Sequence, residues 1–375
     1  MTGRRRTLET DLRGALRRAL PQTPRLLEAA AGSPVYLVGG AVRDLLLGLD
    51  PAEIDLVTEE DPRPLAARLG GSVVEHPRFG TASLELDGVP VDVARARSET
   101  YSDPGALPAV VPATLREDLG RRDFTVNAMA VPLGPDPALI DPHGGREDLE
   151  RGLLRVLHGR SFTDDPTRAL RAARYAARFG FELEPATAGL IAATDLSTVS
   201  GERRRAELLR ICAEPSAPRA LRLLESWGLV ELREGGAELA GRVREVLSAA
   251  PWSEIAPLAE TVLAAALGPP GREGELAASA PSRPSQGYEL ARGREGTELA
   301  IARAMGATWL DDYVSEWSRV ELVIGGDDLI AAGVPRGPAV GRGLGGALRR
   351  KLDGEVSGRE EELEAALAAA RDTER

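Results

Sequence analysis

The pattern of apolar and polar residues divides the sequence near residue 150. Before this point, short runs in which apolar residues predominate or alternate with polar ones are separated by Gly, Pro and Asp turns, which is typical of strands. Asp87-Gly88 lies between two such runs and predicts a hairpin turn. The expected strands are Val35–Val38, Ile54–Thr58, Ser72–Glu75, Thr81–Leu86, Val89–Ala94 and Ala128–Leu133.

After about residue 165, Ala, Leu, Arg and Glu recur at helical spacing almost to the end of the sequence. Gly268–Gly287 is rich in Pro, Gly and Ser, so it is the best candidate for a loop or linker in this part. The whole pattern predicts an α+β chain, with an N-terminal α/β part and a longer helical remainder.

Composition narrows the class of protein. A chain of 375 residues with 43% hydrophobic content can form two or three packed units. The net charge of −11 argues weakly against a nucleic-acid partner, although phosphate contacts need only a local basic patch. Cys212 is the only cysteine, which excludes a disulfide within the chain and a Cys-based zinc site. No apolar run reaches the roughly 18 residues of a membrane span, and the Arg-rich start lacks the apolar core of a signal peptide, so we expect a cytoplasmic protein.

The candidate chemistry begins with two glycines and two acids. Gly39 and Gly40 follow an expected strand and precede a helix expected from about Val42 to Leu47, and such a turn can cradle a phosphate. Glu53 and Asp55 alternate along the next strand, so they point the same way and can share a cation. Taken singly, each half is typical of an ordinary turn or of a solvated strand face. A glycine-cradled phosphate beside two metal-binding carboxylates is, however, the minimal equipment for nucleotidyl transfer.

Asp92 is a third acid of interest. It faces away from the valines on either side of it in Val89–Ala94. If this strand lies beside Ile54–Thr58, three carboxylates converge, and Asp92 could take a proton from an attacking hydroxyl. An exposed strand acid without a role is an equally good interpretation.

The string G-G-A-V-R-D at 39–44, followed by E-I-D-L-V-T at 53–58, resembles the polymerase-β-type nucleotidyltransferases. Within that superfamily it looks like the class II CCA tRNA nucleotidyltransferase and bacterial poly(A) polymerase branch, which generally carries Asp-x-Asp where this chain has Glu53 first. The resemblance implies Mg²⁺ ions held by Glu53 and Asp55, and a triphosphate held by Gly39, Gly40 and Arg43.

The string R-R-D-F-T-V-N-A at 121–128 closely matches the second motif of this family. On the residues alone, Arg122 could bind phosphate and Asn127 a hydroxyl, or the stretch could be a surface ion pair before a capped turn. The resemblance implies that Arg122, Asp123 and Asn127 bind the nucleotide and distinguish ribose from deoxyribose. The segment from Glu99 to Arg121 resembles a flexible loop that complete CCA-adding enzymes keep.

A helix with an arginine face is expected after Pro166. Four arginines lie within an arc of roughly 120° on this helix and face something anionic: Arg168, Arg171, Arg174 and Arg178. The segment resembles the family's fourth motif, E-D-x-x-R, with Asp164 replacing Glu. This implies that Asp165 and Arg168 form an amino-acid template for the incoming base and that Arg171 and Arg174 bind the triphosphate. Asp165 as a plain helix N-cap is the alternative.

Two further segments complete the resemblance. D-P-H-G-G at 141–145 matches a hinge between head and neck, and Glu202-Arg203 with Glu207 resembles a motif thought to brace the template helix. In the tail, a Gly/Pro loop leads into a helix that ends in a basic cluster, which could hold tRNA phosphates or simply be a charged helix end. The candidate tRNA-binding residues are Arg336, Arg349, Arg350 and Lys351.

The resemblance implies an N-terminal mixed-sheet nucleotidyltransferase head followed by an all-helical neck, body and tail. We place a helical extension at 1–33, the catalytic head at 34–150, the neck at 151–212, and the body and tail at 213–375. The expected activity is addition of C, C and A to the tRNA 3′ end from CTP and ATP. The alternatives are a poly(A) polymerase, a partial A-adding or CC-adding enzyme, or an inactive RNA-binding module. The three histidines, at 76, 143 and 158, leave no room for the HD phosphohydrolase domain of some relatives.

Overall fold

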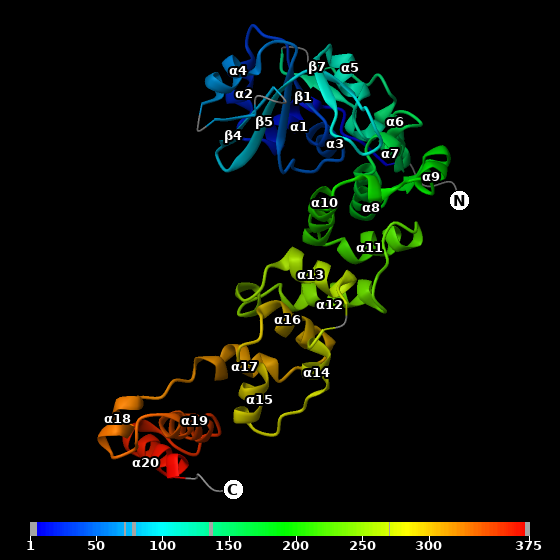
Figure 1. Cartoon of the computed structure of the whole chain (residues 1–375). Coiled ribbons are helices and arrows are strands. Elements are labelled where there is room, and N and C mark those ends of the chain that lie inside the picture. Colours follow the sequence, from blue (N-terminus) through cyan, green and yellow to red (C-terminus); the bar gives the residue numbers. More distant parts are fainter. Residues whose placement is uncertain (1–5, 71–72, 77–79, 135–137, 270, 372–375) are drawn as a thin grey trace. The chain divides into compact units, whose positions relative to one another are not determined.

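The computed structural model describes residues 6–70, 73–76, 80–134, 138–269 and 271–371. The chain forms two compact units, Met1–Leu208 with Arg222–Val230, and Leu209–Leu221 with Glu231–Arg375 (Figure 1). The divisions predicted at residues 33 and 150 both fall inside the first unit and stay predictions about finer organisation.

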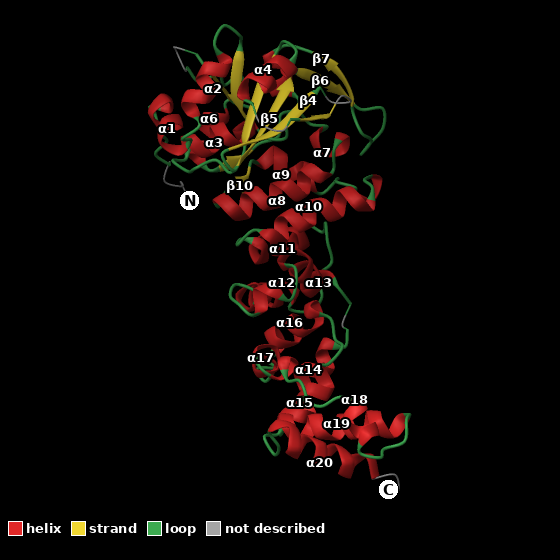
Figure 2. Cartoon of the chain, turned by 90° about the vertical axis from the view of Figure 1, so that its left-hand side faces the viewer, coloured by secondary structure: helices red, strands yellow, loops and turns green. Residues whose placement is uncertain are grey.

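A six-stranded mixed sheet forms the centre of the first unit, in the order β3-β4-β5-β2-β1-β8. β2 and β5 are parallel, and the other neighbouring pairs are antiparallel. The strands are β1 (Val35–Val38), β2 (Ile54–Thr58), β3 (Val74–His76), β4 (Thr81–Leu86), β5 (Val89–Arg95) and β8 (Ala130–Pro132). The described strands all lie in this unit, which confirms the α+β class (Figure 2).

The predicted strands agree closely with the sheet. β1, β2 and β4 have the predicted bounds, β5 extends one residue further, and β8 is shorter than expected. Ser72 of the predicted third strand lies outside the described residues, and the strand begins at Val74. The predicted hairpin turn joins β4 to β5, with φ of 51° at Asp87 and 83° at Gly88.

Helices complete the first unit. α1 and α2 belong to the same hydrophobic cluster as the sheet, through Leu12, Leu16 and Leu26 among others, so the N-terminal extension packs as part of the head. The helices are α1 (Leu12–Ala19), α2 (Thr23–Ala30), α3 (Gly40–Leu46), α4 (Pro62–Leu69), α5 (Leu115–Gly120), α6 (Gly145–Arg151), α7 (Ser161–Asp164), α8 (Thr167–Phe179) and α9 (Pro185–Ile191). Two small ladders accompany them: β6 (Arg97–Thr100) pairs with β7 (Ala109–Pro112), and β9 (Leu153–Leu154) with β10 (Glu182–Leu183).

From residue 201 onward, helices joined by loops are the only regular secondary structure among the described residues. The α-helices are α10 (Gly201–Ala213), α11 (Ala217–Ser226), α12 (Gly236–Val246), α13 (Leu258–Leu267), α14 (Glu273–Ala278), α15 (Pro284–Ala291), α16 (Gly296–Met305), α17 (Leu310–Ser315), α18 (Gly326–Ala331), α19 (Pro338–Leu352) and α20 (Gly358–Arg371). The loop or linker predicted at Gly268–Gly287 is only partly correct, because α14 and the start of α15 lie within it and the described residues on either side of α14 are non-helical. Leu276 and Ser285 are buried, and this packing outweighs the local Pro and Gly content within the two helices.

At the C-terminal end, α19 and α20 approach each other closely. A Cβ built on Gly346 would lie 2.3 Å from the Cβ of Ala369, and one on Gly343 would lie 2.8 Å from the carbonyl oxygen of Ala366. These contacts require glycine at both positions. Among the described residues, no helix combines the length and apolar character needed to cross a bilayer.

Candidate active site

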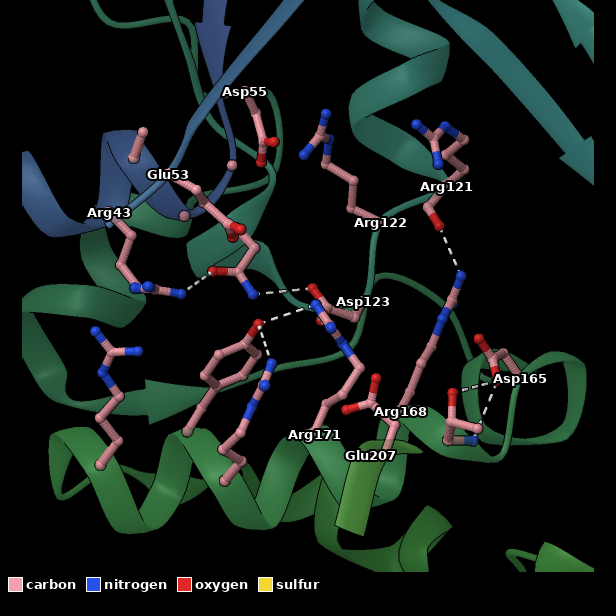
Figure 3. A pocket seen from close by; sticks show the side chains of 18 of the residues that line it. Arg43, Glu53, Asp55, Arg121, Arg122, Asp123, Asp165, Arg168, Arg171 and Glu207 are labelled. Carbon is pink, nitrogen blue, oxygen red and sulfur yellow. Dashed lines mark hydrogen bonds and ion pairs between the residues drawn. The ribbon is translucent and has the colours of Figure 1, made fainter. Parts of the chain in front are cut away.

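A cavity of about 560 Å³ opens in the first unit between the sheet and α8 (Figure 3). Its lining brings together most of the residues singled out from the sequence. These are Gly39, Gly40, Arg43, Glu53, Asp55, Arg122, Asp123, Asn127, Asp165, Arg168, Arg171 and Arg174. Asp92 is not part of that lining, and the four tail candidates belong to the other unit.

The glycine turn lies directly against the acidic side of the cavity. Gly39 has φ of 71° and ψ of −133°, a backbone conformation that side chains other than glycine rarely adopt. A Cβ at this position would lie 2.7 Å from Nη1 of Arg122 and 3.4 Å from Oδ2 of Asp55. Glycine is therefore required by the backbone, and a side chain here would also displace the Arg122 guanidinium. α3 begins at Gly40, two residues earlier than predicted.

Three carboxylates meet at β2 and β5. Asp55 and Asp92 are paired across the two parallel strands, so their side chains leave the same face of the sheet, and Glu53 precedes β2. The expectation that the strand of Asp92 lies beside the strand of Asp55 is confirmed. Burial raises the pKa of Asp55 to about 6; Glu53 and Asp92 push it in the same direction, while Arg122 and Arg171 oppose them.

These carboxylates suit a divalent cation. Among the residues that the structure describes, no group of three or more His, Cys, Asp or Glu side chains is arranged as a metal site. Mg²⁺ does not need one, because it commonly takes one or two carboxylates and completes its shell with water and substrate phosphates. A cation bound by Glu53 and Asp55 would offset both the burial of the Asp55 charge and the carboxylate repulsion that adds to it in raising the pKa of Asp55.

The arginine face of α8 forms the opposite wall, with Arg168, Arg171, Arg174 and Arg178 all lining the cavity. Nε of Arg171 donates to Oδ2 of Asp123 at 2.8 Å, and its Nη2 donates to the Tyr175 hydroxyl at 2.9 Å. Burial alone would raise the pKa of Asp123, but Arg171 and the Asn127 amide outweigh it and lower the pKa to about 2. Arg171 is therefore a fixed cation at the cavity wall.

Arg43 is more deeply enclosed than a surface phosphate ligand. It is 4% exposed, its Nε donates to Asp44, and its Nη1 donates to Oδ1 of Asn127 at 2.7 Å. Its guanidinium lies 4.5 Å from the Phe179 ring centroid and 5.1 Å from that of Tyr175. Asn127 in turn donates to Asp123 at 3.0 Å. A continuous polar chain thus links Arg43 to Arg171 through Asn127 and Asp123.

The two residues of the predicted base template have different partners. Oδ1 of Asp165 accepts from the backbone N–H and hydroxyl of Thr167, as a helix cap would, and also from Nη2 of Arg203 at 3.0 Å. Arg168 donates to the Ser161 hydroxyl at 2.8 Å and to the Arg121 carbonyl at 2.7 Å. Arg203 on α10 thus contacts Asp165 just before α8, and bracing of the template helix by this contact stays a prediction.

Comparison with known proteins shows two family regions. Residues 35–155 match the poly A polymerase head domain, and residues 180–232 match the probable RNA and SrmB-binding site of polymerase A. The CC-adding tRNA nucleotidyltransferase of Deinococcus radiodurans is 36% identical over 360 residues, which are 91% of this chain and 90% of that protein. This chain belongs to the CCA-adding and poly(A) polymerase family of nucleotidyltransferases.

Other relatives of the family differ in length and product. The A-adding tRNA nucleotidyltransferase of Halalkalibacterium halodurans is 44% identical over 193 residues, and the matched region covers 48% of this chain and only 45% of that protein. A solved CCA-adding enzyme in an apo form is 29% identical, with a TM-score of 0.78 over 97% of this chain and 99% of that one. A CCA-adding enzyme in complex with CTP is 28% identical, with a TM-score of 0.70 over 99% of each chain.

Tyr175 also lines the cavity, although the sequence interpretation placed it only on the buried side of α8. Its hydroxyl accepts from Arg171 and Arg174, and three guanidinium groups lie near its ring: those of Arg43, Arg171 and Arg174. A lone tyrosine among alanines in an arginine-rich helix was the available signal. The ring gives the arginines a common surface to pack on.

The basic cluster of the tail is largely paired with acids. Lys351 donates to Glu362 at 2.6 Å, and the Glu362 side chain is 0% exposed. Arg350 lies 3.1 Å from Glu355, and Arg349 lies 4.0 Å from Glu289. Arg336 is exposed. Contact of these residues with tRNA stays a prediction, and Lys351 has a structural role within its own unit.

Proposed function

We propose that this chain adds C, C and A in order to the 3′ end of tRNA, using CTP and ATP and releasing pyrophosphate. The observation that carries the proposal is the cavity itself, in which the Glu53 and Asp55 carboxylates share one space with the α8 arginines. A nucleoside triphosphate needs both, because its phosphates carry negative charge and its α-phosphate must be activated for attack.

Some residues of the site would bind the triphosphate, and others would take part in the chemical step. The fixed cation Arg171, together with Arg174, holds the triphosphate, and Gly39 lets the backbone approach it closely. The tRNA 3′-oxygen forms a bond to the α-phosphorus, the bond from that phosphorus to the bridging oxygen breaks, and pyrophosphate leaves. Asp92 is outside the cavity lining but is paired with Asp55 across β2 and β5, and from there it would accept the hydroxyl proton. When bound by Glu53 and Asp55, Mg²⁺ would neutralise charge on the α-phosphate and the leaving group.

Base selection would fall to Asp165 and Arg168, which line the same cavity as the proposed triphosphate ligands. Their donors and acceptors can match cytosine or adenine. Uracil or guanine would leave buried polar groups unpaired, which costs about 1–3 kcal/mol for each group. This supports an enzyme that accepts CTP and ATP and rejects the other two nucleotides.

The segment from Glu99 to Arg121, which resembles the flexible loop of complete CCA-adding enzymes, supports such an enzyme over a CC-adding one. Within it, Gly105 donates to the carbonyls of Thr163 and Asp164 beside the template helix. CC addition is the second candidate function, since a CC-adding enzyme is similar over nine-tenths of both chains.

Sequencing of extended 3′ ends decides the product. A tRNA transcript without CCA, and one that ends in CC, are each incubated with CTP, with ATP and with both nucleotides, in the presence of Mg²⁺. We expect C, C and A on the first transcript and a single A on the second. A halt at CC with ATP present would establish the CC-adding alternative. Addition of A only to the CC-ending transcript would establish an A-adding enzyme, and long runs of A on any RNA would establish a poly(A) polymerase.

A further inference from the structure

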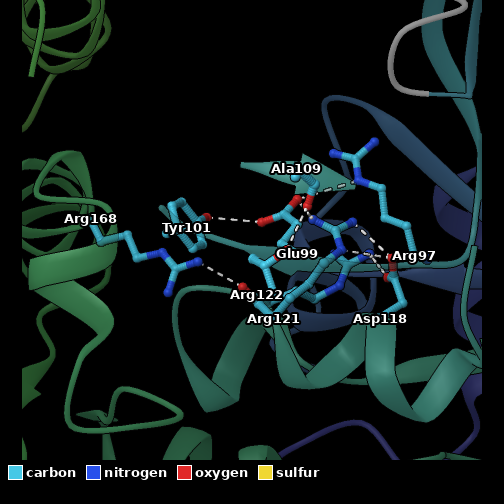
Figure 4. Close-up of polar contacts among 9 residues, drawn as sticks. Arg97, Glu99, Tyr101, Ala109, Asp118, Arg121, Arg122 and Arg168 are labelled. Carbon is cyan, nitrogen blue, oxygen red and sulfur yellow. Dashed lines mark hydrogen bonds and ion pairs between the residues drawn. The ribbon is translucent and has the colours of Figure 1, made fainter. Parts of the chain in front are cut away.

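Glu99, at the base of the β6–β7 loop, gathers three donors around one carboxylate. Its side chain is only 7% exposed. It accepts from Nη1 of Arg121 at 2.7 Å, from the Tyr101 hydroxyl at 2.9 Å and from Nε of Arg97 at 3.3 Å (Figure 4). A buried carboxylate needs such partners, because an unpaired charge is costly away from water.

A second buried carboxylate, that of Asp118, also binds the Arg121 side chain. Asp118 on α5 is 0% exposed and accepts from Nε of Arg121 at 2.9 Å and from Nη2 of Arg122 at 3.0 Å. The guanidinium of Arg121 is therefore fixed between Glu99 and Asp118. Burial would raise the pKa of Asp118, but Arg122 and Arg121 outweigh it and lower the pKa.

Arg121 also binds Arg168, the residue proposed to read the base, through its main chain. The main-chain carbonyl of Arg121 accepts from Nη2 of Arg168 at 2.7 Å, and Arg168 is almost fully buried. Figure 4 shows the side chain of Tyr101 next to Arg168 on the loop side. Burial and the Glu99 charge raise the pKa of Tyr101 to about 12, so its hydroxyl keeps its proton and donates at neutral pH.

We propose that Glu99 is a positioning residue for Arg168. By fixing Arg121 and Tyr101, it holds the Arg168 guanidinium in the orientation that reads the incoming base. This inference rests on the proposed function, in which Arg168 distinguishes cytosine and adenine from uracil and guanine. It adds that this discrimination depends on Glu99, which lines the same cavity and acts on Arg168 through Arg121 and Tyr101.

A purely structural role for Glu99 gives a different expectation. If the cluster only joined β6 to α5, its loss would lower stability and would weaken binding of every nucleotide equally. If Glu99 positions Arg168, the ratio of affinities for CTP and UTP changes. The ratio is thus the quantity to measure.

The test compares Glu99→Gln with wild type and with Glu117→Gln in the full chain. Glu117 lies next to Asp118 on α5, but it is exposed and accepts from Thr114 instead of from a residue of this cluster, and a glutamine there can still accept those bonds. Equilibrium binding of CTP and of UTP is measured for each protein with Mg²⁺ present. We expect Glu99→Gln to lose roughly tenfold in the CTP-to-UTP preference, because a charge-assisted bond to Arg121 is weakened. The Glu117→Gln ratio should equal that of wild type.

A second variant keeps the test decisive if Glu99→Gln does not fold. Arg121→Lys preserves the carbonyl that binds Arg168 but cannot bridge Glu99 and Asp118 with a single ammonium, and it should lose preference in the same direction. A folded Glu99→Gln or Arg121→Lys protein with the wild-type ratio of CTP to UTP affinity would overturn this inference and leave the proposed function standing. A wild-type protein with no preference for CTP would overturn base reading in the proposed function, and the inference with it.

Discussion

Replacement of Asp55 by Asn should make the protein more stable while it removes activity. Asp55 lies at the acidic side of the cavity, where burial and two neighbouring carboxylates disfavour its charged form. Asn has nearly the same shape and no charge to desolvate. We therefore expect the variant to unfold less readily at neutral pH in the absence of divalent cations.

The magnitude follows from the pKa of Asp55. In the folded chain it is raised from 3.8 to about 6, which corresponds to about 3 kcal/mol of unfavourable free energy when the carboxylate is ionised. Because the folded pKa is the higher one, the wild type keeps this stability below about pH 4 and loses it as the pH rises through 6. The gain from Asp55→Asn should thus be near zero in acid and reach up to about 3 kcal/mol at pH 7 to 8.

Calorimetric unfolding in a chelator, at several values between pH 4 and pH 8, measures this difference. Asp61→Asn is a suitable control, since Asp61 is an exposed helix cap whose pKa is lowered and whose replacement can still cap. Addition of Mg²⁺ should stabilise wild type more than Asp55→Asn, because a ligand that binds only the folded state raises its stability. An Asp55→Asn protein that is less stable than wild type at pH 7, or a difference independent of pH, would refute the reasoning.

Substitutions at three other residues test separate parts of the molecule. Glu53→Ala should abolish nucleotide addition without lowering the unfolding temperature, whereas Glu53→Asp should stay active; near-normal turnover of Glu53→Ala in a primer-extension assay would contradict the metal assignment. Asp165→Asn can still cap α8, so a change in its base selection, measured with all four nucleotides, would indicate a template and unchanged selection a cap. Lys351→Ala should lower the free energy of unfolding of the second unit by about 2 kcal/mol, because it leaves Glu362 buried without its cation, and a urea titration that shows no loss would contradict this.

The sequence predicted local features of the fold well because they depend on local patterns. Alternation gave β1, β2 and β4 their bounds, and Asp87-Gly88 gave the hairpin. The parallel pairing of Asp55 with Asp92 depends on the order of strands across the sheet, which no local pattern encodes, so their proximity could only be stated as a condition.

Within the site, residue types were predictable and their partners were not. The arginine face of α8 followed from helical spacing, yet its attachment to Asp123 joins residues 48 positions apart. Arg43 was expected to bind phosphate, and its enclosure by Phe179 and Tyr175 arises from the packing of α3 against α8. Glu99 carried no motif that marked it, because its importance comes from three donors assembled by the fold.

The packing of the N-terminal segment has a consequence for synthesis on the ribosome. Arg6 donates to the carbonyl of Phe179 at 2.6 Å and lies over the ring of Phe181, while Leu223, Trp227 and Leu229 pack against the core that contains α1. The first unit therefore cannot complete its native contacts until about residue 230 has left the exit tunnel. At translation rates of roughly 5–20 residues per second, the start of the chain would wait about 10–45 s for these last residues of the unit. During this interval the part of the core that Leu223, Trp227 and Leu229 cover stays open, although α1 and α2 can already pack on α3 and α4.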